Sequence, residues 1–149
     1  MDQRMTMVTL GVRDLARARR FYEAGLGWRQ GGGVEGNVAF YELAGGVLLG
    51  LYGLEALAED ATLELAKLEP GKNFGGMALA YNVASPAEVD ATLKEAVAAG
   101  GTVIKAGEKV FWGGYSGYFA DPDGHLWEVA HNPFWTLRDD GTVSLAAPK

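Results

Sequence analysis

The sequence predicts an α+β protein of two βαβββ modules, which form a shared curved mixed sheet around a central trough, with the helices on the outside. Two observations lead to this fold class. The order of strand, helix and further strands occurs twice along the chain, and the second half can be aligned with the first. Asp14 then falls on Ser85, helix cap on helix cap, and Gly50 falls on Glu128. Modules of this size bury one sheet face against their own helix and curve the other around a trough.

The first half contains one strand, one helix and two further strands. Residues 7–12 are rich in aliphatic and β-branched side chains, which is typical of a strand. Asp14 is a suitable N-cap for an amphipathic helix over 15–26, about three turns long, that Gly27 ends. After a glycine break at 31–33, strands are predicted over 38–43 and 47–52 around a turn at 44–46.

The second half repeats this order. A strand is predicted over 77–83, and Ser85-Pro86-Ala87-Glu88 forms a capping box with proline at the first helical position. The helix ends at the glycines 100–101, and a strand over 102–105 and a loop or strand edge over 109–114 follow. Residues 115–120 and 125–130 form a hairpin around Asp121-Pro122-Asp123-Gly124, whose residues suit a tight turn.

These elements predict one domain over residues 1–135, with module one at 1–60, a connector at 61–74 and module two at 75–135. Pieces of helical spacing between 54 and 68 precede the proline and glycines of the connector. Residues 136–149 are expected to form a polar C-terminal tail with little to bury.

Composition excludes several classes of protein. With 149 residues, 48% hydrophobic and 21% charged, the chain matches a soluble globular domain, and its apolar runs are too short to span a membrane. The N-terminus has no signal core, so a cytoplasmic location is expected. A net charge of -6 argues against nucleic acid as a partner. The absence of cysteine excludes disulfides, thiolate nucleophiles and thiolate metal ligands.

Glu128 is the unusual residue of the last predicted strand. Strand alternation places Leu126, Glu128 and Ala130 on one face of the sheet. A carboxylate within an otherwise apolar strand either faces solvent or serves metal binding, proton transfer or ligand recognition inside a cleft. Both interpretations stay open at this stage.

Three stretches resemble the vicinal oxygen chelate superfamily, which includes glyoxalase I, bleomycin-resistance and fosfomycin-resistance proteins and extradiol dioxygenases. They are VTLGVRDLARARRFYEAGLGW, VASPAEVDATLKEAVAAGG and GYFADPDGHLWEVAHNP. Together they span most of residues 7–133, and their order and spacing match the superfamily in both halves. The resemblance implies the fold, which hosts many different reactions.

In metal-using members, the resemblance implies four ligands, at positions that correspond here to Met7, Gly50, Ala78 and Glu128. Glu128 alone suits a divalent cation, since Met7 offers a thioether for Cu(I) and the other two offer no side-chain ligand. One carboxylate is too few for a catalytic ion, so no metal is expected.

The two histidines are not expected to replace the missing ligands. His125 and His131 lie an odd number of residues from Glu128, so a regular strand directs them to the opposite face. A bulge at the strand end could still reorient His131. Otherwise both rings are expected to pack beside the helix or to cap backbone groups.

The resemblance also implies a ligand site in the trough. Its expected lining is largely apolar with one acid, Glu128, and includes Met7, Thr9, Leu48, Tyr52, Leu126, Trp112 and one of Tyr115 and Tyr118. The two tyrosines are three residues apart, so only one of them can face the trough. Such a lining suits a flat or cationic small molecule. Alternatively, the aromatic side chains are core and dimer contacts.

Two main functions follow as hypotheses. The first is a homodimer that binds a small organic molecule without the usual divalent metal, as drug-sequestering members of the superfamily do. The second is a lyase, isomerase or dioxygenase in which Glu128 is a metal ligand or a general base. An interaction module without a ligand site is a third possibility.

Overall fold

The computed structural model covers residues 1–149 and describes residues 3, 5, 7–60 and 77–144. The chain divides into two compact units, Met1–Gly75 and Gly76–Lys149. The predicted connector at 61–74 lies outside the described residues. The expectation of one shared trough concerns the placement of the two units relative to each other, and it stays a prediction.

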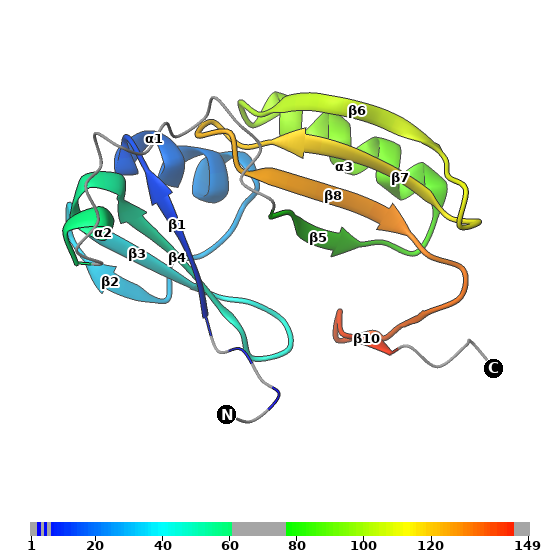
Figure 1. The fold of residues 1–149 in the computed structure, drawn as a ribbon, viewed down its shortest axis with the longest axis horizontal. Coiled ribbons are helices and arrows are strands. Elements are labelled where there is room, and N and C mark those ends of the chain that lie inside the picture. Colours follow the sequence, from blue (N-terminus) through cyan, green and yellow to red (C-terminus); the bar gives the residue numbers. More distant parts are fainter. Residues whose placement is uncertain (1–2, 4, 6, 61–76, 145–149) are drawn as a thin grey trace. The chain divides into compact units, whose positions relative to one another are not determined.

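The first unit has the elements β1 (Met7–Val12), α1 (Leu15–Arg19), η1 (Arg20–Gly25), β2 (Gly32–Val34), β3 (Val38–Glu42), β4 (Leu48–Gly53) and α2 (Leu54–Asp60). Its four strands form a sheet in the order β1-β4-β3-β2 (Figure 1). Strand β1 runs parallel to β4, whereas β3 is antiparallel to both of its neighbours.

The predicted helix after Asp14 is present, but its second half winds as a π-helix. Asp14 caps α1 as expected, since its carboxylate accepts a hydrogen bond of 2.9 Å from the Arg17 amide. In η1, the Leu26 amide donates to the Phe21 carbonyl, five residues back. Phe21 and Tyr22 are both fully buried, and their rings meet edge to face at 4.9 Å. Regular helical spacing in the sequence does not reveal this change of winding.

The glycine break predicted at 31–33 contains strand β2, which corrects that prediction. All three residues of β2 are exposed, so the strand is held by backbone pairing with β3 rather than by side-chain burial. Gly33 has a φ of 139°, and a Cβ atom there would overlap the Val38 carbonyl. Glycine therefore permits a close approach of the two strands.

The second unit repeats the order of the first. It contains β5 (Leu79–Asn82), α3 (Pro86–Ala98), β6 (Thr102–Lys109), β7 (Tyr115–Ala120) and β8 (Leu126–His131), followed by β9 (Thr136–Leu137) and β10 (Val143–Ser144). The main sheet has the order β5-β8-β7-β6, with β5 parallel to β8 (Figure 1). Strand β6 extends beyond the predicted 102–105. The two βαβββ modules are therefore confirmed, and each forms its own four-stranded mixed sheet.

Strand register confirms how the two halves correspond. Thr9 pairs with Gly50 between β1 and β4, and Ala80 pairs with Glu128 between β5 and β8. When Gly50 is aligned with Glu128, their strand partners Thr9 and Ala80 also correspond. Two positions earlier on the same strands, Met7 then corresponds to Ala78. This is the correspondence that the sequence pattern gave.

In each unit, one face of the sheet packs against the helix that follows its first strand. The buried side chains of the first unit include those of Leu10, Val12, Ala18, Phe21, Tyr22, Ala39, Tyr41, Leu49 and Leu51. In the second unit they include Val89, Leu93, Ala96, Phe119, Trp127 and Val129. The Phe119 and Trp127 rings stack across β7 and β8 with centroids 6.0 Å apart. This packing leaves the opposite face of each sheet for other contacts.

The predicted capping box before α3 and the predicted turn of the last hairpin are both present. The Ser85 hydroxyl accepts from the Glu88 amide at 3.3 Å, and the Glu88 carboxylate accepts from the Ala84 amide at 3.1 Å. In the turn between β7 and β8, Asp121 is buried, and its carboxylate accepts from the amides of Asp123 and His125, both at 2.9 Å. This turn fixes where β8 begins.

Residues 136–144 form a small hairpin, where only a polar tail was expected. Strands β9 and β10 are antiparallel. Their turn is closed by hydrogen bonds from the Thr142 amide to the Asp140 carboxylate and from the Gly141 amide to the Arg138 carbonyl, both 2.9 Å long. Gly141 has a φ of 80°, as the glycine of a hairpin turn commonly does. The dipeptide Asp140-Gly141 therefore indicates a hairpin, which the polar composition of the segment does not.

Among the described residues, no helix combines the length and the apolar character needed to cross a membrane.

Glu23 links the helical segment of the first unit to β3, and this contact predicts a pH dependence. Its carboxylate accepts from Arg19 Nε at 2.8 Å and from the Tyr41 hydroxyl at 3.0 Å. The hydrogen bond from Arg19 is the main reason that the pKa of Glu23 lies below its ordinary value. The resulting stabilisation is therefore present above the unfolded pKa of about 4.3 and is lost as the pH falls through the lower folded value.

We expect Glu23→Gln to lower the free energy of unfolding of the first unit at pH 7 by about 1 kcal/mol or less, because Glu23 and Arg19 are partly exposed. At pH 3 the difference from the wild type should shrink. Urea unfolding followed through the NMR signals of the β3 amides would measure it. Glu42→Gln, at an exposed position of the same strand, is the matched control. An equal difference at both pH values would contradict the linkage.

Candidate functional site

Glu128 lies on the central strand β8, within a row of side chains that crosses the sheet of the second unit. Its neighbours in register are Ala80 on β5 and Tyr118 on β7, and Tyr118 in turn pairs with Lys105 on β6. Residues directly opposite one another on neighbouring strands point to the same face. We call this face, which is turned away from α3, the Glu128 face. It brings a carboxylate, a phenol and an ammonium group into one row.

Tyr118 and Glu128 lie directly opposite each other on β7 and β8, and the carboxylate influences the pKa of the phenol. The pKa of Tyr118 is raised, first by burial and then by the charge and hydrogen bonding of Glu128, while the charge of Lys105 acts in the opposite direction. The phenol therefore keeps its proton at neutral pH, on the same face of the sheet as the carboxylate.

Two register shifts in β6 bring Lys105 into this row and Glu108 onto the same face. Val103 pairs with Phe119 on the helix-packed face, but the next pair is Lys105 with Tyr118, so Ile104 is an extra residue. A second shift separates Lys105 from Glu108, which pairs with Ser116. Lys105 and Glu108, three residues apart, consequently share the Glu128 face.

An ion pair holds the Lys105 side chain. Its Nζ atom lies 2.8 Å from Oε1 of Glu108, and this hydrogen bond is the main cause of the raised pKa of Lys105. Glu128 and Tyr118 act on the pKa of Lys105 in the same direction through their charges. The ammonium group is thus oriented from one side by Glu108 and remains partly exposed.

The structure separates the two tyrosines, as their spacing predicted, and it shows that Tyr118 is the one that shares a face with Glu128. Tyr115 lies on the helix-packed face, where its hydroxyl contacts Asp90 of α3 at 3.0 Å and the Gly107 carbonyl at 2.9 Å. Tyr115 therefore lies away from Glu128.

The corresponding row of the first unit has no ionisable side chain. It consists of Thr9, Gly50 and Phe40, which pair in register. A Cβ atom at Gly50 would lie 3.3 Å from the Phe40 ring and 3.4 Å from the Thr9 hydroxyl. The Phe40 ring thus covers the position that corresponds to Glu128.

The other residues expected to line the trough are dispersed. Tyr52 lies on the same face as Gly50, two positions further along β4, and Met7 is partly exposed on the edge strand β1. Trp112 belongs to the loop between β6 and β7, where its ring lies so close to Gly114 that a Cβ atom there would overlap it. The structure therefore unites Tyr118 with Glu128 in one unit and Thr9 with Tyr52 in the other.

Lys105 and Glu108 were missed by the sequence reasoning, because regular alternation puts residues three apart on opposite faces. One signal was available in Gly107. A Cβ atom there would overlap the Asp90 carboxylate and lie 2.7 Å from the Tyr115 ring. A glycine inside a strand often marks such a bulge or close approach.

The donor groups present do not suit the divalent metal that the superfamily implies. Within the part of the chain that the structure describes, no three His, Asp or Glu side chains come together to hold an ion. Nδ1 of His131 lies 3.3 Å from the Val83 carbonyl, and the backbone of His125 belongs to the Asp121 turn. Neither histidine joins Glu128 in a ligand cluster.

The row predicts how Tyr118 titrates. Glu128→Gln should bring the pKa of Tyr118 down toward its ordinary value, because the variant removes the negative charge that disfavours the phenolate. Lys105→Met should raise it, because the ammonium favours the phenolate. Titration of ¹³Cζ-tyrosine signals by NMR, with Tyr118→Phe to assign the resonance, would measure both changes. A Tyr118 signal that is indifferent to both variants would show that the three groups do not interact.

Comparisons with known proteins identify the family and the fold. The family model described as Glyoxalase/Bleomycin resistance protein/Dioxygenase superfamily matches residues 4–129. A glyoxalase-related enzyme from Fulvimarina pelagi is 37% identical, with a TM-score of 0.86 over 97% of this chain and 99% of its own. A search among curated proteins gave no match.

Two further solved structures share the fold at lower identity. A glyoxalase/bleomycin resistance protein/dioxygenase family enzyme from Burkholderia phytofirmans PsJN is 23% identical, with a TM-score of 0.69 over 85% of this chain and 96% of its own. A lactoylglutathione lyase from Agrobacterium tumefaciens is 21% identical, with a TM-score of 0.62 over 88% and 95% of the two chains. With the family model matching most of its length, the chain belongs to the glyoxalase/bleomycin resistance protein/dioxygenase superfamily.

Proposed function

We propose that the chain binds a small organic molecule on the Glu128 face without the usual divalent metal. The observation that supports this most directly is the row of Lys105, Tyr118 and Glu128, in which the strand register brings three polar groups together. Apolar positions on the same face, including Leu126, can contact the body of a ligand. Sites for small molecules commonly combine an apolar surface with a few oriented polar groups.

The metal-free part of the proposal rests on the ligand positions in both units. Gly50 and Ala78 offer no side-chain donor, and the Phe40 ring covers the first of these positions. Glu128 lies directly opposite the Tyr118 phenol, and no second carboxylate or histidine of the described residues shares its row. A single carboxylate lacks the roughly three protein ligands that a catalytic zinc site uses.

The polar groups of the row indicate which hydrogen-bonding groups the ligand carries. Glu128 accepts hydrogen bonds, the Lys105 ammonium donates them, and both charges lie in one row. Lys105 also pairs with Glu108 on the same face, so the ammonium offsets only part of the negative charge, and the row suits a cation or a neutral molecule with a donor and an acceptor. A planar amide has both groups side by side.

Acid–base catalysis is a second candidate function, and the position of Tyr118 directly opposite Glu128 favours it. A carboxylate next to a phenol is suited to accept a proton, and a nearby ammonium stabilises negative charge on the substrate. Chemical conversion of a bound compound that is lost in Glu128→Gln but kept in Glu95→Gln would distinguish catalysis from simple binding.

The assembly is proposed to be a homodimer that acts on small molecules, with neither nucleic acid nor membrane as a partner. Its proposed location is the cytoplasm.

The metal-free proposal predicts the metal content of the protein. Protein purified without chelators or metal-affinity resin should contain less than about 0.1 divalent ions per chain, since its ligand positions lack the donors that a tight site needs. Elemental analysis would measure this, and Ni²⁺ or Zn²⁺ should not raise the melting temperature. One ion per chain that disappears in Glu128→Gln would overturn the proposal.

Benzamide is a suitable first probe of the Glu128 face, because it is flat and carries a donor and an acceptor. We expect benzamide to shift the NMR signals of Tyr118 and Glu128, and Glu128→Gln to weaken its binding about tenfold, the usual effect of losing a hydrogen bond to a charged group. Methyl benzoate has a similar shape but no hydrogen-bond donor. It should bind weakly, and with the same affinity to the wild type and to Glu128→Gln.

Glu95→Gln is the matched control, since Glu95 is exposed on α3. It should leave benzamide binding unchanged. Equal affinities of the wild type and Glu128→Gln for benzamide would remove Glu128 from the site.

A further inference from the structure

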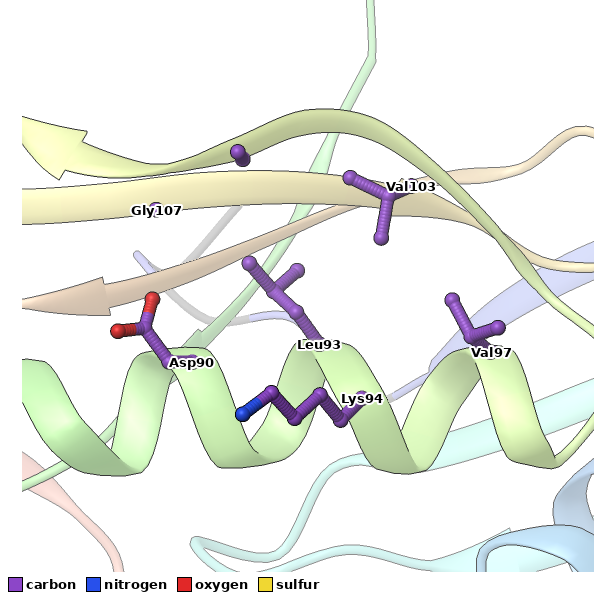
Figure 2. A pocket seen from close by; sticks show the side chains of 7 residues that line it. Asp90, Leu93, Lys94, Val97, Val103 and Gly107 are labelled. Carbon is purple, nitrogen blue, oxygen red and sulfur yellow. The ribbon is translucent and has the colours of Figure 1, made fainter.

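A second hollow lies on the other side of the second unit's sheet, between α3 and the edge strand β6. Its volume is about 380 Å³, within the range of small-molecule sites. Figure 2 shows Leu93 and Val97 pointing from α3 into this space and Val103 facing them from β6. Val97 and Val103 remain 49% and 39% exposed, so two apolar walls are open to a ligand.

One end of this pocket is polar. Asp90 and Gly107 line it, and Figure 2 shows the Asp90 carboxylate directed toward the strand that carries Gly107. The Tyr115 hydroxyl lies 3.0 and 3.2 Å from the two Asp90 oxygens and 2.9 Å from the Gly107 carbonyl. A phenol has one proton, so it can donate fully to one of these three oxygens at a time. The two Asp90 oxygens and the Gly107 carbonyl can therefore accept more hydrogen bonds than the Tyr115 hydroxyl can donate.

Glycine at position 107 makes this arrangement possible. A Cβ atom there would overlap the Asp90 carboxylate and crowd the Tyr115 ring. The backbone consequently approaches α3 closely, and it presents a carbonyl beside a carboxylate at the end of an apolar space. Burial and the hydrogen bond to Asp90 both raise the pKa of Tyr115, which keeps the phenol protonated.

We propose that this pocket binds a small organic ammonium ion, whose apolar body lies between Leu93, Val97 and Val103 and whose N–H groups donate to Asp90 and the Gly107 carbonyl. The charge of Asp90 complements the cation, and the extra N–H donors satisfy oxygens that the single Tyr115 proton cannot serve together. The site is separate from the Glu128 face and does not depend on the function proposed for it.

Lys94 is the group that argues for an anion instead. It lines the same pocket, and Figure 2 shows its side chain extending along α3. The polar end, however, contains a carboxylate and a carbonyl, which repel an anion's oxygens. Lys94 carries the same charge as a bound ammonium, so its removal should strengthen the binding of a cation and not weaken it.

The test uses the full chain and 2-phenylethylammonium as the probe, followed by NMR titration. We expect saturable shifts of the Asp90, Val97 and Gly107 amides, at least tenfold weaker binding in Asp90→Asn, and unchanged binding in Glu95→Gln. The control removes one charge from an exposed position of the same helix that does not line the pocket. Lys94→Gln should bind the probe as tightly as the wild type or more tightly.

Phenylacetate has the same ring with an anionic group, and it should bind at least tenfold more weakly than the ammonium probe. Val97→Gln alters a half-exposed wall without touching the acceptors, and it should weaken the probe severalfold even if Asp90→Asn fails to fold. Equal binding of the two probes, equal affinities of Asp90→Asn and Glu95→Gln, or shifts confined to the Glu128 face would each overturn the proposal.

Discussion

The register of β8 between β5 and β7 is the constraint on which the candidate site depends. Strand side chains alternate, so a slip of one residue would send Glu128 into the helix-packed core and Trp127 to the opposite face. The turn at Asp121 opposes such a slip, because its buried carboxylate binds the amides of Asp123 and His125 just before β8 begins. The stacked rings of Phe119 and Trp127 hold the same register from the helix side. Glu128 is thereby fixed opposite Tyr118.

Duplication supplied the scaffold twice, but the two rows have diverged in chemistry. Thr9, Gly50 and Phe40 occupy the places that Ala80, Glu128 and Tyr118 occupy in the second unit. Both rows have an aromatic residue on the strand next to this position, Phe40 in the first unit and Tyr118 in the second, and Tyr118 carries a hydroxyl on the face of the carboxylate. Where the carboxylate is absent, the ring covers a glycine instead. The ionisable chemistry is therefore concentrated in one unit.

Features set by residues close in sequence were predictable, whereas features set by long-range packing were not. The caps at Asp14 and Ser85, the Asp121 turn and the alternation around Glu128 follow from local chemistry, and the structure shows each of them. Strand β2 has three exposed residues and no hydrophobic pattern to reveal it. The register shifts of β6 on either side of Lys105 have no counterpart in its side-chain pattern, so the placement of Lys105 became visible only in three dimensions.

Strand β7 shows how one stretch of sequence can serve two sites. Tyr115 and Tyr118 are three residues apart, so they emerge on opposite faces. The Tyr115 hydroxyl binds Asp90, whereas Tyr118 lies directly opposite Glu128. Burial is the first cause of the raised pKa in both phenols, and the adjacent carboxylate is the second. The two pairs differ in their third partner. Tyr118 has the Lys105 ammonium nearby, while Tyr115 has the Gly107 carbonyl. That difference in charge is why we assign a donor-and-acceptor molecule to one face of the sheet and a cation to the other.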